Sequence, residues 1–569
     1  MKNNKLQSSF QFGIGALTIP LCSLSVLSLS SSCNRSVEKI QKPNVLFILV
    51  DDLGWKDLSC TGSDFYETPN VDTLASYSTV FSQGYAACSV SSPARASIMT
   101  GVYTAEHNIT DWIGAPQGEE IRAQKKYTKM LPAIYDHSLK QGYTTIAEAL
   151  KLNGYATYYY GKWHLGGVEQ QSLPTDHGFE VNVGGYKAGS PGKGGYFSPY
   201  QNPFLKDGPN GENLSWRLAS ECAEGIKNHM KNHPDKPFFS MLSFYAVHAP
   251  LQTTKSYWKY FRDKADERGY LKDGFKIDYG LPVRKYQDNP IYAGLISHMD
   301  DGVGIVLKQL KELGILDNTL IIFTGDNGGI CSGVSSTSNL PLRGGKGTQW
   351  EGGIRVPFII KEPHQKQHRV SDTPVCGIDF YPTILDYANI NVQKALNDGD
   401  AGKIGEIAGT PEPDGGLVPQ PRIDGVSIKP LVEGGEIVSR NLYWDYPHYS
   451  ASTGGVPCAI ERSGDWKLIL YFEDNHTELY NLKNDPGEQK VLNTEYPAKV
   501  QELTNDLKKW LKSTNGALPK NDPQYNALLH KKYLENLKNS IKLREKNRLE
   551  SFQENFQPNK DWWGSYIPD

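Results

Sequence analysis

An apolar run at residues 44–50 (NVLFILV) limits sharply how this chain can fold. A run that is apolar on both faces is typical of a strand buried inside a parallel sheet. The run ends in two adjacent carboxylates, Asp51 and Asp52, which repel each other and are tolerated beside a cation or in open solvent. Sites form at the carboxyl edge of open α/β sheets. The sequence therefore predicts a site here, with a solvated loop pair as the alternative.

Other apolar runs end in the same way and alternate with helical segments. Amphipathic or capped helices are expected at 68–75, 145–152, 216–233 and 291–314, and strands at 155–160, 237–246, 318–323 and 358–361. Polar residues follow three of these strands: Lys162 and His164, then His248, then Asp326 and Asn327. This alternation predicts an α/β fold with a mainly parallel sheet sandwiched by helices.

The pattern changes from about Asn441. Short aromatic strands at 442–446, 459–462, 466–472 and 477–481, followed by a helix at 497–511, predict a smaller antiparallel-sheet-plus-helix subdomain. The predicted domains are a catalytic α/β domain (40–435), the C-terminal subdomain (436–520) and a charged helical tail (521–569). The tail is expected to be a solvated helix, with an oligomer or surface contact as the alternative. It would be docked by Leu528, Leu534, Leu537 and Ile541.

The N-terminus has the features of a targeting segment. Lys2 and Lys5 precede an apolar, small-residue run from Phe10 to about Leu29, which ends in a serine-rich stretch before Cys33. Residues 1–33 are therefore predicted to be a signal peptide of the lipoprotein type, with Cys33 as the lipidated residue. The alternative is an ordinary cleaved signal peptide. In either case we expect export, and membrane contact through a lipid anchor alone.

Composition excludes some classes of function. A formal net charge of −3 argues against bulk nucleic-acid binding, and a mean hydropathy of −0.50 is typical of a soluble globular protein. Two of the eight cysteines lie in the signal region, and the other six lack CxxC spacing. That scatter argues against a structural zinc site.

The stretch Cys88–Gly101 contains a Ser-x-Pro-x-Arg core formed by Ser91, Pro93 and Arg95. Pro93 suits the first turn of a helix, and Gly101 suits its end. Ser91 is thus expected at a helix N-terminus, where free N–H groups and the helix dipole favour an anion. Taken alone, the serine could equally be an ordinary helix cap.

Five motifs in this order resemble the type I sulfatases of the alkaline phosphatase superfamily, over roughly residues 43–490. They are Asp51-Asp52, the Ser91 core with Thr100-Gly101, Gly161-Lys162-Trp163-His164-Leu165-Gly166, Asp326-Asn327-Gly328 and Gly345-Lys346-Gly347. The resemblance implies that Ser91 is oxidised to Cα-formylglycine by a radical-SAM maturing enzyme. The proline at plus two and the arginine at plus four select Ser91; Cys88 has Val90 at plus two.

The same resemblance assigns the other roles. Asp51, Asp52, Asp326, Asn327 and the oxygen of residue 91 would bind one Ca²⁺, because all are hard oxygen donors. One hydroxyl of the hydrated aldehyde would attack sulfur, and the other would let the sulfate ester collapse by elimination. Arg95 would hold this diol, and Lys162 and Lys346 would clamp sulfate oxygens. His248 would be the general acid and His164 the base in the elimination; the two assignments could be exchanged.

Two further segments are predicted to lie near the substrate, with a structural role as the alternative for each. They contain Asp176 and His177, and His448 within Tyr446-Pro447-His448-Tyr449. The resemblance implies a sulfated carbohydrate substrate, with galactose or N-acetylgalactosamine sugars favoured, and a location in the periplasm or on the outer membrane of a Gram-negative bacterium. The alternatives are a phosphonate monoester or phosphodiester hydrolase, and an inactive lipoprotein that binds sulfated glycans.

Overall fold

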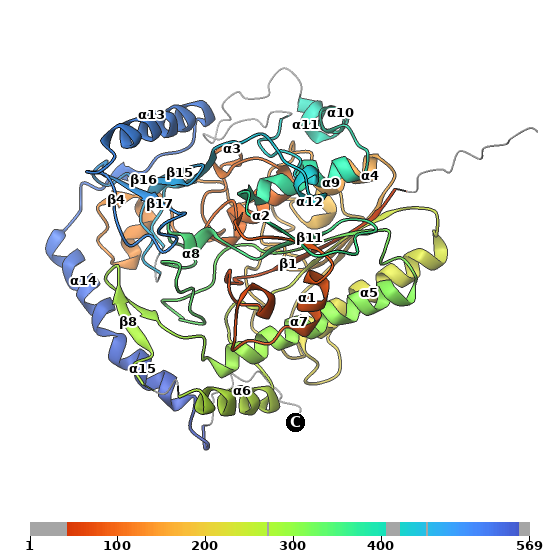
Figure 1. Ribbon diagram of the computed structural model, residues 1–569, viewed down its shortest axis with the longest axis horizontal. Helices are drawn as coiled ribbons and strands as arrows, with labels where there is room; N and C mark the ends of the chain where they lie inside the picture. Colours follow the sequence, from red (N-terminus) through yellow and green to blue (C-terminus); the bar gives the residue numbers. More distant parts are fainter. Residues whose placement is uncertain (1–41, 270–271, 405–421, 451–452, 557–569) are drawn as a thin grey trace, which may run out of the picture. The chain divides into compact units, whose positions relative to one another are not determined.

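The computed structural model describes residues 42–269, 272–404, 422–450 and 453–556 (Figure 1). The predicted signal peptide and the lipidation of Cys33 lie outside these residues. Within the described part of the chain, no helix combines the length and the apolar character needed to cross a membrane.

The core is an eight-stranded sheet in the order β12-β2-β11-β10-β1-β7-β5-β6. Five neighbouring strands, β10, β1, β7, β5 and β6, are parallel, whereas β11 is antiparallel to both β10 and β2. This confirms the predicted mainly parallel sheet. The strands are β1 (Asn44–Val50), β2 (Thr79–Phe81), β5 (Ala156–Gly161), β6 (Val181–Val183), β7 (Phe238–Ser243), β10 (Thr319–Gly325), β11 (Phe358–Lys361) and β12 (Arg369–Ser371).

Both faces of the sheet are apolar because side chains alternate along each strand. In β1, Leu46, Ile48 and Val50 join one core cluster, and Val45, Phe47 and Leu49 join the other. Helices α1 (Pro69–Ala75), α5 (Leu214–Asn232) and α7 (Pro290–Glu312) cover the first face. Helices α2 (Ser91–Thr100), α4 (Ile146–Leu152) and α9 (Phe380–Tyr387) cover the second (Figure 1). Helices on both faces complete the predicted sandwich.

A second sheet lies towards the C-terminus. Its four antiparallel strands run in the order β14 (Leu442–Tyr446), β15 (Cys458–Ser463), β16 (Trp466–Tyr471) and β17 (Thr477–Asn481). Helix α13 (Pro497–Thr514) packs on it through Leu503 and Leu507, which are buried with Ala459 and Leu468. The predicted antiparallel sheet with its helix is thereby confirmed.

The tail differs from the prediction. It forms two helices, α14 (Ala527–Asn539) and α15 (Ile541–Glu550), separated by Ser540. Leu528 and Leu534 are 81% and 45% exposed, so the expected leucine stripe does not dock the tail. The buried guanidinium of Arg548 does so instead, with its NH2 atom 2.5 Å from Asp288 Oδ2. Leu528 and Leu534 lie six residues apart on α14, about 240° around a helix with 3.6 residues per turn, so these two leucines do not form one docking face.

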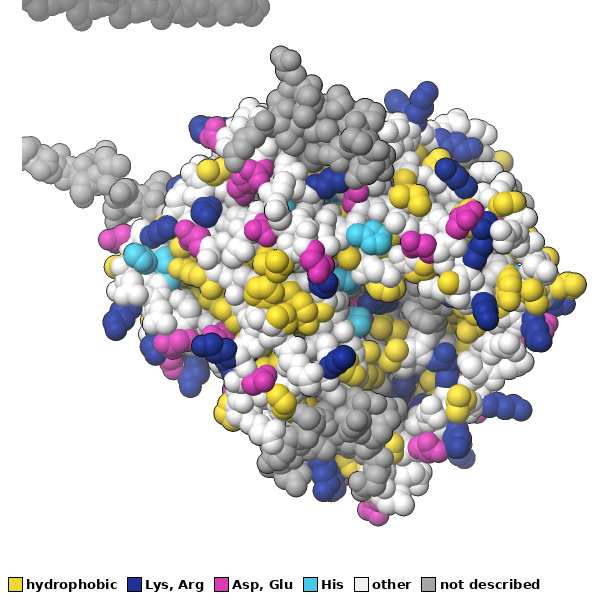
Figure 2. Space-filling model, turned by 180° about the vertical axis from the view of Figure 1, so that it is seen from behind, with side chains coloured by type: hydrophobic (Ala, Val, Ile, Leu, Met, Phe, Trp, Pro, Cys, Tyr) yellow, Lys and Arg dark blue, Asp and Glu magenta, His cyan; other side chains and the backbone are white. Residues whose placement is uncertain are grey.

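The surface carries both signs of charge. On the face shown in Figure 2, Lys and Arg side chains are interspersed with Asp and Glu. This mixture agrees with the small formal net charge of the chain, −3.

Candidate active site and metal-binding residues

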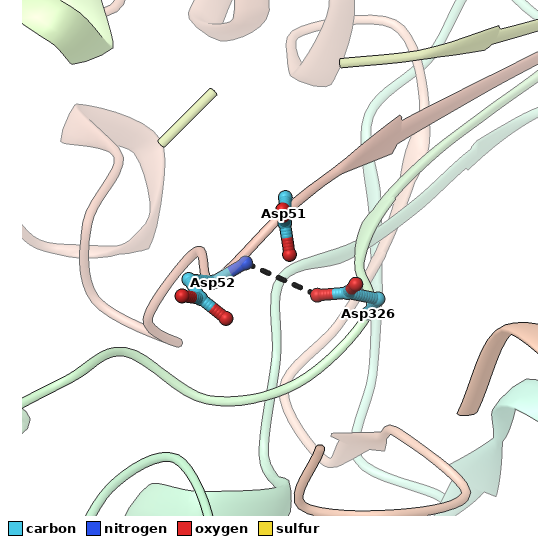
Figure 3. A group of neighbouring side chains, drawn as sticks. All are labelled: Asp51, Asp52 and Asp326. Atoms are coloured by element: carbon cyan, nitrogen blue, oxygen red, sulfur yellow. Dashed lines mark hydrogen bonds between the residues drawn. The ribbon is translucent and has the colours of Figure 1, made fainter. Parts of the chain in front are cut away.

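Three carboxylates meet at the carboxyl edge of the central sheet (Figure 3). Strands β1 and β10 are parallel neighbours with Val50 opposite Gly325, so the residues that follow them, Asp51 and Asp326, emerge side by side. Asp52 has a φ of 59°, and its N–H donates to Asp326 Oδ1 at 3.1 Å. One oxygen from each of the three lies within 4.8 Å of the others, and all three side chains are buried.

Burial makes this arrangement costly without a counter-charge. Burial, together with the neighbouring carboxylates, raises the pKa of Asp51 to about 8 against the opposing effect of Lys162. Burial also disfavours ionised Asp52, but Lys346 and His248 outweigh this effect and lower its pKa. Arg95 and Lys162 likewise lower the pKa of Asp326 in spite of burial. Three carboxylates this close are stable in the ionised form only beside cations.

The donor set fits a hard divalent cation. Asp52 Oδ2 is buried and has no hydrogen-bond partner among the described residues. Asn327 adds a fourth side-chain oxygen next to Asp326, and its Nδ2 donates to Asp52 Oδ1 at 2.8 Å. Carboxylate and amide oxygens are the ligands that Ca²⁺ takes in proteins. Four of the five residues predicted as metal ligands are thus brought together.

Ser91 lies against the same carboxylates. It is the first residue of α2, after Val90 in extended conformation, and the helix ends at Gly101 with a φ of 73°. Its Oγ lies 3.2 Å from Asp51 Oδ1 and 3.1 Å from Asn327 Oδ1, and it can donate its proton to either. The oxygen of residue 91 therefore adjoins two of the predicted ligands.

Arg95 lies one turn later on α2 and joins three strand ends. Its Nε donates to Asp326 Oδ2 at 2.8 Å, and its NH1 donates to the Lys162 carbonyl and to Ser243 Oγ. Its NH2 is buried 3.9 Å from Asp51 Oδ1 and has no hydrogen-bond partner in the described chain, so one donor remains free beside the carboxylates. Sequence reasoning missed Ser243; a serine inside an apolar strand was the available signal.

Two lysines and a histidine complete the charge balance. Lys162 Nζ lies 2.6 Å from Asp51 Oδ2, and Lys346 Nζ lies 2.5 Å from Asp52 Oδ1. His248 Nε2 lies 3.7 Å from Asp52 Oδ2, while its Nδ1 faces the Ala249 carbonyl at 2.6 Å and must carry the proton there. Burial, together with Lys346, lowers the pKa of His248 to about 4.

His164 occupies a more enclosed position than His248. It is 5% exposed, its Nδ1 has no partner among the described residues, and its Nε2 lies 3.4 Å from the Ile113 carbonyl. A side chain at Gly189 would collide with the ring, so the segment around Gly189 lies directly on it. Burial and the nearby Lys162 and Arg95 charges lower its pKa well below the usual range. His248 thus faces Asp52 directly, whereas His164 lies near enough to Lys162 and Arg95 to be affected by their charges.

The remaining predicted residues have other contacts. Asp176 is exposed and accepts from the Leu173 N–H, and buried His177 lies 2.9 Å from Ser172 Oγ. These contacts stabilise a loop and do not join the cluster at Ser91. His448 is buried, with its Nε2 2.7 Å from Thr110 Oγ1.

The end of β14 nevertheless approaches the site through Tyr446, two residues before His448. Tyr446 packs on Val90 and Ala94 at the start of α2, and its hydroxyl lies 3.3 Å from Asp111 Oδ1. Burial raises the pKa of Asp111 to about 7, while the charge of Lys346 acts in the opposite direction. Sequence reasoning missed Asp111, because its partner lies more than 300 residues away.

Comparison with known proteins matches residues 43–390 to the family described as Sulfatase, and residues 404–516 to the C-terminal region of N-sulphoglucosamine sulphohydrolase. A protein named Sulfatase from Formosa agariphila is 29% identical, covering 87% of this chain and 94% of its own length. The N-acetylgalactosamine-6-sulfatase of Homo sapiens is 27% identical, covering 86% and 88%. Among solved structures, Ps i-CgsB in complex with k-i-k-neocarrahexaose has a TM-score of 0.62 at 24% identity, covering 89% and 99%.

Proposed function

Because this chain belongs to the sulfatase family, and is thus a sulfuric ester hydrolase, we propose that it removes O-sulfate groups from a glycan. The proposal rests chiefly on one observation: Ser91 Oγ lies among buried carboxylates that are flanked by two lysines and a histidine. Relatives named as N-acetylgalactosamine-6-sulfatases support a carbohydrate substrate, with galactose or N-acetylgalactosamine type sugars favoured.

We further propose that residue 91 acts as Cα-formylglycine. A serine sulfate would have no internal route for releasing its sulfate, whereas a hydrated aldehyde keeps a second hydroxyl whose proton can be removed so that the ester collapses. The buried NH2 of Arg95, free of partners within the described residues, supports this by supplying a spare donor for a second oxygen. The conversion removes two hydrogen atoms from Ser91 and requires a maturing enzyme, expected to be of the radical-SAM class.

In this proposal each charged side chain of the site has a separate role. Lys162 and Lys346 hold sulfate oxygens, and their charges offset the negative charge of the group under attack. His248, whose side chain is 25% exposed, lies on the open side. The negative charge of a bound sulfate favours a second proton on its Nε2, and this proton is passed to the leaving alcohol oxygen. His164, buried beneath the segment at Gly189, takes the proton from the residual hydroxyl at position 91. The different exposure of the two rings favours this assignment over the reverse.

Asp51, Asp52, Asp326 and Asn327 would hold one Ca²⁺ in this proposal. When bound, the ion supplies Lewis-acid stabilisation of negative charge on the oxygens it contacts. The carboxylates themselves orient Ser91, Lys162 and Lys346 through the contacts already described.

The test compares Ser91→Ala with Ser92→Ala, its buried neighbour on α2. Ser91→Ala should abolish sulfate release from sulfated sugars while keeping the circular dichroism spectrum of the wild type, because alanine fits a helix. Ser92→Ala should retain activity. Residual turnover by Ser91→Ala would refute the nucleophile assignment. Peptide mass spectrometry on protein from the native host should find residue 91 two hydrogen atoms lighter than serine.

Two controls define the reaction further. A sulfate monoester, a methylphosphonate monoester and a methyl phosphodiester of one alcohol separate a sulfatase from a phosphonate monoester or phosphodiester hydrolase. We expect the sulfate ester to give the highest kcat/KM. For the cell location, we propose an exported lipoprotein in the periplasm or on the outer membrane. Cys33→Ser should then move the protein from the membrane fraction to the soluble fraction.

A further inference from the structure

We propose that a cavity beside His248 binds a second anionic group of the glycan substrate, a sulfate or a carboxylate on a neighbouring sugar, and that Arg544 of the tail is its principal contact. This inference rests on the proposed function and names what the site recognises beyond the scissile sulfate. The cavity has a volume of about 360 Å³.

The walls of this cavity continue directly from catalytic segments. Ala249 and Pro250, which follow His248, form one wall. Residues 333–335 form a second wall; they belong to the loop that follows β10 and carries Asp326 and Asn327. Helix α15 closes the third side with Arg544, Asn547 and Arg548. A ligand in the cavity is therefore in contact with the same loops that carry the catalytic groups.

The cavity has an excess of positive charge. Arg284 and Arg548 both pair with Asp288, at 2.7 Å and 2.5 Å, and Arg548 also pairs with Glu545. Arg544 has no carboxylate within ion-pair distance among the described residues. Burial accordingly lowers the pKa of Arg544. An anion would compensate this guanidinium, and a planar fork of donors matches sulfate and carboxylate geometry.

Arg544 is already held in place for such a contact. Its Nε donates to Ser540 Oγ at 3.1 Å, and its NH1 donates to the Gly333 carbonyl and lies 3.4 Å from Ser335 Oγ. These bonds leave NH2 without a hydrogen-bond partner from the described chain. A fixed side chain loses little conformational entropy on binding, so its remaining donor can contribute to affinity.

The rest of the lining suits a sugar ring. Phe275, Ile291 and Val334 supply apolar surface, and Asn289 and Asn547 supply polar groups. A cavity of this size and mixed character lies at the lower end of the range that small ligands occupy. The tail helix α15, which was expected to be a solvated surface helix, thus gains a role in recognition.

The test uses Asn547, an exposed residue of the cavity with no role in catalysis. Asn547→Asp is isosteric, and it places a carboxylate three residues from Arg544, where it can pair with that guanidinium. Asn547→Lys adds a positive charge at the same point. Lys546→Gln is the matched control: it changes the net charge by the same amount as Asn547→Asp but lies outside this cavity on the same helix.

The first measurement is crystallographic and needs no substrate. Crystals soaked with selenate, an anomalously scattering analogue of sulfate, should show an anomalous peak beside Arg544 in the wild type and none in Asn547→Asp. The absence of a peak in the wild type would overturn the proposal. A peak of equal height in the wild type and Asn547→Asp would mean an adventitious ion only, and would overturn it as well.

The second measurement separates a substrate group from a free anion. For a multiply sulfated oligosaccharide that the wild type hydrolyses, Asn547→Asp should raise KM roughly tenfold with kcat unchanged. Asn547→Lys should lower KM, and Lys546→Gln should leave it within about twofold. A monosulfated monosaccharide should respond to none of them. If the KM for the oligosaccharide is also unchanged in these variants, the cavity binds a free anion and the proposal fails. If nothing is hydrolysed, the proposed function fails, and the selenate experiment alone decides whether the cavity binds an anion.

Discussion

Arg95 bonds to residues from more strand ends than any other side chain of the site described here. Its guanidinium joins helix α2 to the ends of three strands through Asp326, the Lys162 carbonyl and Ser243. Its side chain and that of Asp326 are almost fully buried, at 2% and 0% exposure. In such a place an ion pair is costly to break, because the remaining charge has neither water nor a partner.

Arg95→Met should therefore lower the free energy of unfolding by about 3–5 kcal/mol, measured by urea denaturation in the presence of a chelator. Lys259→Met is the matched control, since the Lys259–Asp263 pair is 64% and 42% exposed and should contribute at most about 1 kcal/mol. Added calcium should reduce the loss in Arg95→Met by sharing the charge of Asp326. Equal losses in the two variants would contradict this account of Arg95.

The roles of His248 and His164 can be distinguished with substrates that differ in their leaving groups. His248→Gln should reduce kcat by ~10²–10⁴ for a sugar sulfate, whose alcohol leaves poorly, and by far less for a nitrophenyl sulfate, whose phenolate leaves without a proton. His164→Gln should reduce both rates alike if it acts after the alcohol has left. Exposed His476→Gln serves as the control. If His164→Gln shows the leaving-group dependence instead, the two roles are exchanged.

At the scale of secondary structure, the sequence predicted strand ends well and long-range caps poorly. Residues 51 and 326 could be placed together because apolar runs identify the strands, and parallel strands end at one edge. A helix at 68–75 would ordinarily be capped by the hydroxyl of its first residue, Thr68. That hydroxyl instead bonds Asp72, and the helix N–H groups of Asn70 and Val71 donate to Asp300 on α7. No local pattern can reveal a cap supplied from 230 residues away.

Asp300→Asn tests this cap. The amide replaces one acceptor by a donor facing the N–H groups of α1, so stability should fall by about 1–2 kcal/mol, as for loss of an N-cap. The loss should depend on pH. Burial raises the pKa of Asp300 from its ordinary value of 3.8 to about 6, so the native state binds a proton that the unfolded chain releases. The stability that the native state gains by binding this proton is complete below pH 3.8 and is lost as the pH rises through about 6.

Urea titrations at pH 4, 5, 6 and 7 measure the difference in unfolding free energy between the wild type and Asp300→Asn. The difference should be largest at pH 4 and should decrease towards pH 7. Asp235→Asn, on an exposed turn, controls for the general effect of removing a carboxylate. A difference that grows with pH would show that Asp300 is stabilised in its ionised form by the N–H groups of α1.

On the scale of the whole molecule, the chain joins segments that are far apart in sequence around one sheet edge. The end of β1 contributes Asp51, and the end of β14 contributes Tyr446. The tail lines the neighbouring cavity through Arg544 and Arg548. The sequence did not predict how the tail docks, since Arg548 resembles the other basic residues of that segment. Its partner, Asp288, precedes α7 and gave no signal of its own. From the sequence alone, every charged residue of such a segment is predicted to be solvated. The fold is needed to identify the one that is buried.

The Arg548–Asp288 pair should decide whether the tail stays docked. Both side chains are at most 1% exposed, so Arg548→Met leaves Asp288 with Arg284 alone and removes the buried anchor of α15. If the pair contributes about 3 kcal/mol to docking, the tail opens roughly a hundredfold more often. Limited proteolysis within residues 527–550 should accelerate accordingly, while cleavage of the central domain stays slow. Lys546→Met, whose side chain is 69% exposed, should match the wild type. Unchanged proteolysis in Arg548→Met would mean that the bonds of Arg544 and Glu545 hold the tail without it.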